Sequence, residues 1–185
     1  MLEIYTKKGH AGVKVEIYGS MATGLAIDSS DLDILVHDFI DQNSPRFHQM
    51  SRQELIDEMQ MIHEALNEVY GVRTNMLIDS ASVPVIKMQM NLTSICDHPL
   101  ALKHKIDQNS LDEEIKILNI DITLDEPSKS SGGIEHLGIK CCKYIKQKME
   151  EFPKLKILAL IFKKFLSLKN LNKPFSGGLS SYSLI

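Results

Sequence analysis

Two aspartates, two positions apart, stand at the start of an apolar stretch, Asp31-Leu32-Asp33-Ile34. In a β-strand, side chains at positions i and i+2 point to the same face, with their backbone positions about 6–7 Å apart. Carboxylate oxygens placed in this way can converge on one hard cation, and Mg²⁺ prefers oxygen ligands while keeping open positions for substrate phosphates. Because neighbouring carboxylates repel each other unless a cation neutralises them, the pair predicts a bound divalent metal.

A Gly-Ser pair, Gly19-Ser20, follows the preceding strand-like segment at residues 13–18. A turn at this point leaves backbone amides free, and the glycine lets a ligand approach the backbone closely. Together with the serine hydroxyl, such a turn can hold the β- and γ-phosphates of a nucleotide. Taken alone, these motifs are more typical of a turn glycine and of two surface acids. The strand, Gly-Ser turn, short spacer and second strand together form a much rarer pattern.

The segments that must position these residues alternate between strand and helix signals. Strands are predicted at residues 13–18, 32–36, 72–78, 83–90 and 115–124, from apolar alternation or short apolar runs. Ser51 and Glu54 form a capping-box pattern, and the apolar residues that follow recur at spacings of three and four until Gly71, which indicates an amphipathic helix. Residues 91–114 fit a loop or a short helix. The order predicts an α+β fold for residues 1–127.

A helical region is predicted after a linker at residues 128–133, whose sequence is SKSSGG. Residues 134–185 make up this region. A first helix begins near Leu137, and Pro153 suits the first turn of a second helix. The spacing predicts that the second helix turns one apolar face toward the core, formed by Leu155, Leu158, Phe162, Phe165 and Leu166.

Charge is distributed unevenly between the two regions. Residues 1–127 carry 10 Lys and Arg against 21 Asp and Glu, a net of −11, whereas residues 128–185 carry 11 Lys against 3 Glu, a net of +8. This asymmetry suits a metal-holding module beside a surface that faces phosphates, or two solvated surfaces of opposite sign. The apolar runs are too short for a membrane span, and the cysteines lack zinc-ligand spacing. We expect an intracellular protein, in the nucleus or the cytoplasm.

Four separated blocks of the sequence stand out together: GSMATGL at 19–25 with SDLD at 30–33, VPVIK at 83–87, NIDIT at 119–123 and PFSGGLSSYSL at 174–184. In this order they resemble the signature of the DNA polymerase β-type nucleotidyltransferases. Their details are closest to the noncanonical poly(A) polymerases and terminal uridylyltransferases, which tail RNA. The resemblance implies a nucleotidyltransferase palm, a mixed β-sheet with flanking helices, at residues 1–127, and the start of an all-helical central domain at 134–185.

The resemblance also implies roles for individual residues. Asp31, Asp33 and Asp121 would bind two Mg²⁺ or Mn²⁺ ions, which stabilise the attacking and leaving oxygens of an in-line displacement. Asp121 also stands where it could accept the proton of the RNA 3′-hydroxyl. Asp125 is a competing third carboxylate, favoured less because it follows the apolar run. The residues implied to contact the nucleotide are Gly19, Ser20, Lys163 and Ser181 at the phosphates and Tyr182, stacked on the base.

The implied reaction is attack of the RNA 3′-hydroxyl on the α-phosphate of a nucleoside triphosphate, with release of pyrophosphate. The leading interpretation is a poly(A) polymerase that adds AMP from ATP to RNA 3′ ends. An RNA-binding protein is the expected partner. Terminal uridylyl transfer from UTP is an alternative; Ser167, where uridylyltransferases often carry a second lysine, favours the poly(A) branch.

Two departures from the family favour another alternative, a catalytically inactive truncated paralogue that acts as a binding module. Leu137-Gly138 stands where close relatives have Asn-Gly, and Ile185 falls inside a helix that continues in the family. A fragment of a longer protein would show the same ending. In either case we expect exposed apolar side chains at Phe162 and Phe165 and low stability of the isolated chain.

Overall fold

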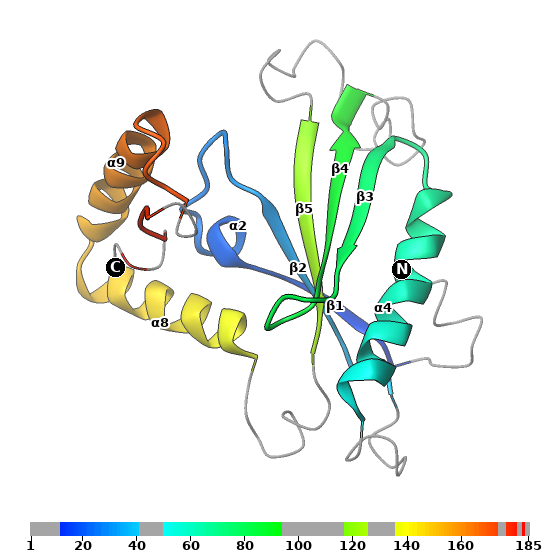
Figure 1. Cartoon of the computed structure of the whole chain (residues 1–185). Coiled ribbons are helices and arrows are strands. Elements are labelled where there is room, and N and C mark those ends of the chain that lie inside the picture. Colours follow the sequence, from blue (N-terminus) through cyan, green and yellow to red (C-terminus); the bar gives the residue numbers. More distant parts are fainter. Residues whose placement is uncertain are drawn as a thin grey trace. The chain divides into compact units, whose positions relative to one another are not determined.

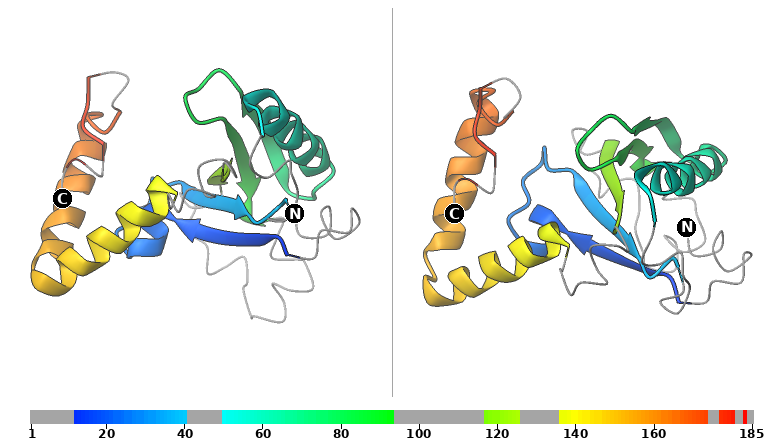
Figure 2. Two further views of the ribbon diagram at one scale, coloured as in Figure 1. Left: turned by 90° about the horizontal axis from the view of Figure 1, so that it is seen from below. Right: turned by 60° about the horizontal axis from the view of Figure 1, so that its bottom comes forward.

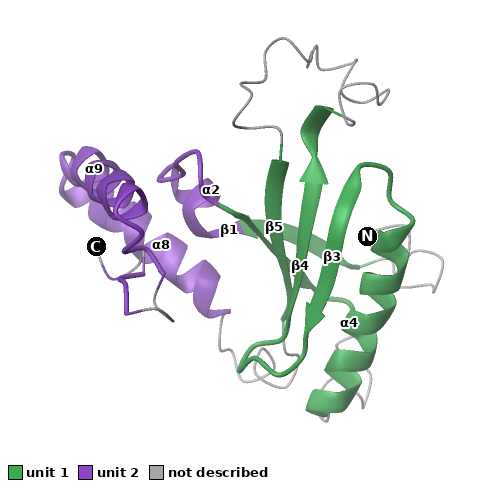
Figure 3. Ribbon diagram, turned by 45° about the horizontal axis from the view of Figure 1, so that its top comes forward, with its two compact units in different colours: residues 1–17, 31–135 green, residues 18–30, 136–185 purple. Residues whose placement is uncertain are grey.

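The computed structural model describes residues 12–40, 50–93, 117–125, 136–173, 177–180 and 183. The chain divides into two compact units, residues 1–17 with 31–135 and residues 18–30 with 136–185 (Figure 3). The predicted linker at 128–133 and most of segment 91–114 lie outside the described residues. Within the described ranges, no helix has the length and apolar character needed to cross a membrane.

A five-stranded mixed sheet forms the centre of the first unit, in the order β1-β2-β5-β4-β3 (Figure 1). β5 runs parallel to β2 and antiparallel to β4, and β4 is antiparallel to β3. The predicted strands are present with their ends shifted by at most two residues, so the expected α+β class is confirmed. The bounds are β1 Lys14–Tyr18, β2 Leu32–His37, β3 Val72–Ile78, β4 Val85–Asn91 and β5 Ile117–Leu124.

Helix α4 (Arg52–Asn67) covers one face of this sheet, as both views of Figure 2 show. The predicted capping box starts the helix: Ser51 Oγ accepts from the Glu54 amide at 3.2 Å, and the Ser51 amide donates to the Glu54 carboxylate at 2.8 Å. The apolar stripe of α4 packs against alternate residues of the strands, and these form the core. Its buried members include Leu55, Met59, Ile62, Leu66, Val36, Ile86, Met88, Ile120, Ile122 and Leu124.

The opposite face of the sheet carries a group of polar side chains beside the buried Leu35 and Thr123. Because side chains alternate along a strand, the residues between the core positions point away from α4. On β2, β5 and β4 these residues are Asp33, Asn119, Asp121, Lys87 and Gln89.

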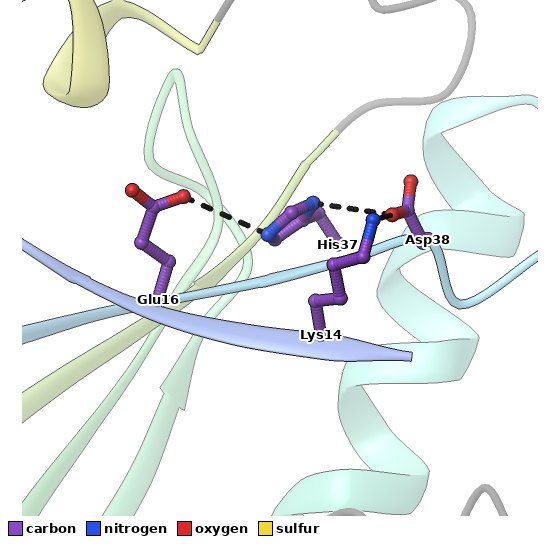
Figure 4. A network of polar contacts seen from close by, with 4 residues as sticks. All are labelled: Lys14, Glu16, His37 and Asp38. Atoms are coloured by element: carbon purple, nitrogen blue, oxygen red, sulfur yellow. Dashed lines mark hydrogen bonds and ion pairs between the residues drawn. The ribbon is translucent and has the colours of Figure 1, made fainter. Parts of the chain in front are cut away.

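Polar contacts join β1 to β2 (Figure 4). Lys14 Nζ lies 2.7 Å from Asp38 Oδ2, and the His37 ring stands between Glu16 and Asp38 at 3.7 and 3.6 Å. Asp38 has a φ of 57°, in the left-handed region that few residues other than glycine adopt. These contacts hold β1 to its neighbour where the apolar core covers it least, since most β1 side chains are exposed.

The second unit contains the short helix α2 (Gly19–Thr23) and the helices α8 (Leu137–Glu151) and α9 (Leu155–Leu168), which meet at a sharp bend (Figure 2). Leu25, Ile145 and Ala159 form its buried cluster. The segment between α2 and β2, residues 24–30, belongs to this unit although it lies between two strands in sequence.

The predicted core face of α9 is wrong in part. Leu158, Phe162 and Phe165 are 51%, 48% and 50% exposed, whereas Ala159, Lys163 and Leu166 are buried. Because α9 is apolar around most of its circumference, spacing alone does not select the buried stripe. The exposure expected for Phe162 and Phe165 is confirmed.

Candidate active site

The structure places Asp33 and Asp121 side by side. They are register partners on the neighbouring parallel strands β2 and β5. Asp31 lies directly before β2 and two residues before Asp33, a spacing that puts both side chains on the polar face of the sheet. The three carboxylates implied by the sequence therefore come from two adjacent strands and share one face.

Asp31 is half-buried, and the pKa of its carboxyl is raised. Burial is the largest cause, and the negative charge of Asp121 is the second; the charge of Lys87 and a hydrogen bond with the Asn119 side chain act in the opposite direction. The like charges of Asp31 and Asp121 are thus close enough to repel each other. A bound cation would relieve this repulsion.

Three further side chains on β4 and β5 take part in this cluster. Lys87 is the register partner of Asp121 and forms an ion pair with it. Gln89 is the register partner of Asn119, and its Nε2 donates to Asn119 Oδ1 at 3.0 Å. The sequence analysis gave these three residues no role. Their contacts depend on the register in which β4 pairs with β5, and these strands lie about 30 residues apart in the sequence. Strand alternation alone would have placed Lys87 and Gln89 on a common face.

The carboxylates fit a divalent cation by their chemistry and by their positions on the strands. The side chains are not arranged to coordinate such a cation. In the ranges that the structure describes, no group of three or more His, Cys, Asp or Glu residues could hold a metal ion. Asp121 is engaged by Lys87 instead. A cation bound by all three carboxylates would require Lys87 to release Asp121.

Asp125, the competing third carboxylate, lies just beyond β5. It lies four positions after Asp121, about 13 Å along an extended strand. Its amide donates to the Val36 carbonyl at 3.0 Å, which keeps the chain on the sheet as β5 ends. Its position therefore favours Asp121 over Asp125 as the partner of Asp31 and Asp33.

Gly19 and Ser20 begin α2 rather than an open turn. Gly19 has a φ of 69°, and its amide is not free, because it donates to Cys142 Sγ at 3.0 Å. The Gly19 carbonyl accepts from Thr23 Oγ1 at 3.1 Å and from Cys142 Sγ at 3.6 Å. The expectation of a free amide therefore does not hold at Gly19. No local pattern in the sequence indicates this contact between Cys142 and a residue 123 positions earlier.

Lys163 is buried on α9, and its Nζ donates to the Leu25 carbonyl at 2.7 Å. Its neighbour Lys164 forms an ion pair with Asp28, and Ser167 Oγ lies 3.1 Å from Ser29 Oγ. Helix α9 thus contacts the segment that leads from α2 to the aspartates. Ser181 and Tyr182 lie outside the described residues, so their implied roles stay predictions.

Comparison with known proteins assigns this combination of mixed sheet and helices to a class of protein, the nucleotidyltransferase palm domains. The solved polymerase core of TRAMP, an RNA surveillance complex, has this fold with a TM-score of 0.62 at 20% identity, covering 99% of this chain and 44% of that chain. The Cid1 poly(U) polymerase with Mg and 3′-dATP bound has a TM-score of 0.59 at 20% identity, covering 98% of this chain and 43% of that chain.

Residues 1–101 match the family described as the mitochondrial-like poly(A) RNA polymerase central palm domain, and the chain belongs to this family. Poly(A) RNA polymerase cid14 of Schizosaccharomyces pombe is 26% identical over 173 residues, 94% of this chain and 19% of that protein. Poly(A) RNA polymerase gld-4 of Caenorhabditis elegans is 29% identical over 175 residues, 94% of this chain and 16% of that protein. The inactive noncanonical poly(A) RNA polymerase protein Trf4-2 of Drosophila melanogaster is 27% identical over 172 residues, 92% of this chain and 32% of that protein. The chain therefore spans less than a third of the length of these relatives.

Proposed function

We propose that this chain carries the catalytic palm of a template-independent RNA 3′-terminal nucleotidyltransferase, a poly(A) polymerase that adds AMP from ATP to RNA 3′ ends. The observation that carries the proposal is the register pairing of Asp33 with Asp121, beside Asp31, on the polar face of the sheet. Membership of a poly(A) RNA polymerase family supports the reaction class. The solved neighbour that holds Mg and 3′-dATP supports a nucleotide substrate and Mg²⁺ as the metal.

In this proposal Asp31, Asp33 and Asp121 supply the oxygen ligands for divalent cations, Mg²⁺ or Mn²⁺. Bound ions of this kind stabilise the charge on the attacking and leaving oxygens of an in-line displacement. The RNA 3′-oxygen forms a bond to the α-phosphorus of ATP, the bond to pyrophosphate breaks, and the hydroxyl proton passes to the Asp121 carboxylate.

The remaining contacts come from the second unit. Gly19 and Ser20 are proposed to approach the triphosphate, Lys163 and Ser181 to contact its phosphates, and Tyr182 to stack on the base. The net charge of +8 over residues 128–185 supports a phosphate-facing role for this region. Lys163 would have to exchange the Leu25 carbonyl for a phosphate oxygen, which its flexible stem allows.

A non-catalytic binding module is the second candidate function. It is favoured by the ion pair that occupies Asp121 and by the similarity to Trf4-2, which is described as inactive. Because the relatives of this chain include such a protein, only an activity measurement separates the two candidates.

The deciding experiment incubates the chain with labelled oligo(A) RNA, Mg²⁺ and each nucleoside triphosphate in turn. The proposal expects tails with ATP, abolished by Asp33→Ala and by Asp121→Asn, whereas the matched variant Asp125→Asn keeps activity. Tails formed from UTP in preference to ATP would instead make the protein a terminal uridylyltransferase. RNA binding without tails from any nucleotide would establish the binding module and refute the polymerase.

The polymerase core of TRAMP belongs to a complex, and by analogy we propose that this chain works with an RNA-binding protein. We place it in the nucleus or the cytoplasm, where RNA 3′ ends are processed. Co-purification of the chain with an RNA-binding protein, lost when RNA tailing is lost, is the corresponding measurement.

A further inference from the structure

The first residue of α2 is held by a side chain from another helix. The Gly19 amide donates to Cys142 Sγ at 3.0 Å, and the Cys142 thiol donates to the Gly19 carbonyl oxygen at 3.6 Å. Cys142 lies on α8 and is buried. Because a thiol is both a weak donor and a weak acceptor, one side chain engages both polar groups of the Gly19 backbone.

Helix α2 receives no side-chain cap from its own N-cap residue. The first amides of a helix have no acceptor within the helix, and capping side chains commonly supply one. The N-cap residue of α2 is Tyr18, and its side chain makes no capping hydrogen bond. The Tyr18 ring packs edge-on against His136 instead. The acceptor for the Gly19 amide therefore comes from α8, through Cys142.

The thiol also fixes a conformation that glycine does not select by itself. Gly19 has a φ of 69°, and glycine populates positive and negative φ about equally readily. Thr23 Oγ1 donates to the carbonyls of Gly19 and Ser20 at 3.1 and 3.2 Å, which holds the carbonyl side from within α2. A change of φ rotates the Gly19 amide relative to its carbonyl, so it would break at least one of the contacts that the thiol makes.

The close approach of α8 to this segment depends on a glycine one helical turn before Cys142. Residues four positions apart lie on the same face of a helix. A Cβ on Gly138 would lie 2.5 Å from Cδ2 of the Tyr18 ring, so the absence of a side chain gives the ring its place. Gly138 and Cys142 thus form one contact face of α8, against which Tyr18 and Gly19 are held.

We propose that Cys142 is a positioning residue, whose thiol holds Gly19 in the conformation that presents Ser20 to the phosphates of the nucleotide. Cys142 acts through Gly19 and does not itself touch the nucleotide. This inference rests on the nucleotide contact of the proposed function and adds to it a residue of α8. When the binding-competent conformation is only partly populated, the apparent affinity falls in proportion to its population, so loss of the thiol weakens nucleotide binding.

The test is calorimetric titration of the full chain with ATP in the presence of Mg²⁺. A net hydrogen-bond contribution corresponds to about a 2–10-fold change in affinity. We expect Cys142→Ala and Cys142→Val to weaken ATP binding by about this factor, and Cys142→Ser to restore it, because a hydroxyl also donates and accepts. Valine keeps the apolar volume and serine keeps the hydrogen bonds, so the three variants separate packing from positioning. Cys141→Ala, at the neighbouring partly exposed cysteine, is the matched control and should leave ATP affinity unchanged.

The amide resonance of Gly19 in the nucleotide-free chain gives a second measurement. It should shift in Cys142→Ala and in Cys142→Val, and stay near its wild-type position in Cys141→Ala. Wild-type ATP affinity in Cys142→Ala, while Ser20→Ala weakens binding, would overturn the positioning role and leave the proposed function intact. Equal losses of ATP affinity and of Tm in the alanine, valine and serine variants of Cys142 would also overturn it, in favour of packing. A wild-type chain that binds no ATP would overturn the proposed nucleotide contact and the positioning role together.

Discussion

Gly138 is expected to tolerate no side chain, although it lies in a helix. An alanine Cβ at this position would lie 2.5 Å from Cδ2 and 2.7 Å from Cε2 of the Tyr18 ring, and 3.1 Å from Cε1 of His136. Carbon atoms in good contact are about 3.5–4.0 Å apart, so the ring would have to move by about 1 Å. Tyr18 directly precedes Gly19, and the ring also packs edge-on against His136 with centroids 5.2 Å apart. The displacement would therefore reach the start of α2.

The magnitude follows from two opposing effects. Overpacking a closely packed site costs about 1–3 kcal/mol, whereas replacing glycine by alanine in a helix contributes up to about 1 kcal/mol of stability. Because the overpacking cost exceeds the helix gain over most of its range, we expect Gly138→Ala to lower the free energy of unfolding by up to about 2 kcal/mol. For a chain of this size, that corresponds to a fall in Tm of up to about 8 °C.

The assay is urea and thermal unfolding followed by circular dichroism, in wild type and in a Tyr18→Ala background. Removing the ring removes the clash, so Gly138→Ala should become neutral or stabilising in that background. Gly12→Ala is the matched control, because among the described residues its Cβ would meet only the Asp38 carbonyl, at 4.0 Å. A Gly138→Ala protein as stable as wild type, or equally destabilised with and without Tyr18, would refute the steric reasoning.

Three further outcomes are expected. Ser51→Ala removes the side-chain cap of α4 and should cost about 1 kcal/mol of unfolding free energy; an unchanged Tm would contradict the role of the capping box. Ile161→Glu, at a position 61% exposed on α9, should reduce self-association in light scattering without lowering Tm, and unchanged scattering would show that the apolar face is not responsible. Burial is the larger cause, and the negative charge of Asp121 the smaller one, of the raised pKa of Asp31. The folded protein therefore holds the Asp31 proton more tightly than the unfolded chain does. As a consequence, the stability of the folded protein falls as the pH rises from the ordinary carboxyl pKa through the raised pKa. Asp31→Asn should therefore raise stability at neutral pH and flatten its dependence on acidic pH, and a lower stability at neutral pH would reverse this interpretation.

The strands and α4 were predictable because their signals are local. Alternation along β2 and the Ser51–Glu54 pattern depend only on neighbouring residues, and each defines an element that the structure contains. The placement of Asp121 with Asp31 and Asp33 could be predicted for another reason: the family resemblance implies it, whereas residue spacing alone does not.

Features that depend on distant partners were not predictable. The apolar surface of α9 does not identify its buried stripe, which is selected by contacts with Leu25 and Ile145. Lys163 is buried because a backbone carbonyl, at Leu25, lies within reach of its ammonium group. The amides of Gln89 and Asn119 meet only in one strand register, and a shift of one residue would move them to opposite faces.

Residues 18–30 are held by hydrogen bonds to residues of α8 and α9, which are synthesised much later in the chain. The hydrogen bonds of Gly19 with Cys142 and of Leu25 with Lys163 join residues separated by 123 and 138 positions. During synthesis on the ribosome, this segment emerges early but acquires these partners only after α8 and α9 have been translated. Contacts between residues so far apart close slowly, because the long intervening loop must first be ordered. The proposed nucleotide-contacting turn is thus expected to mature late, after the sheet that carries the aspartates has already formed.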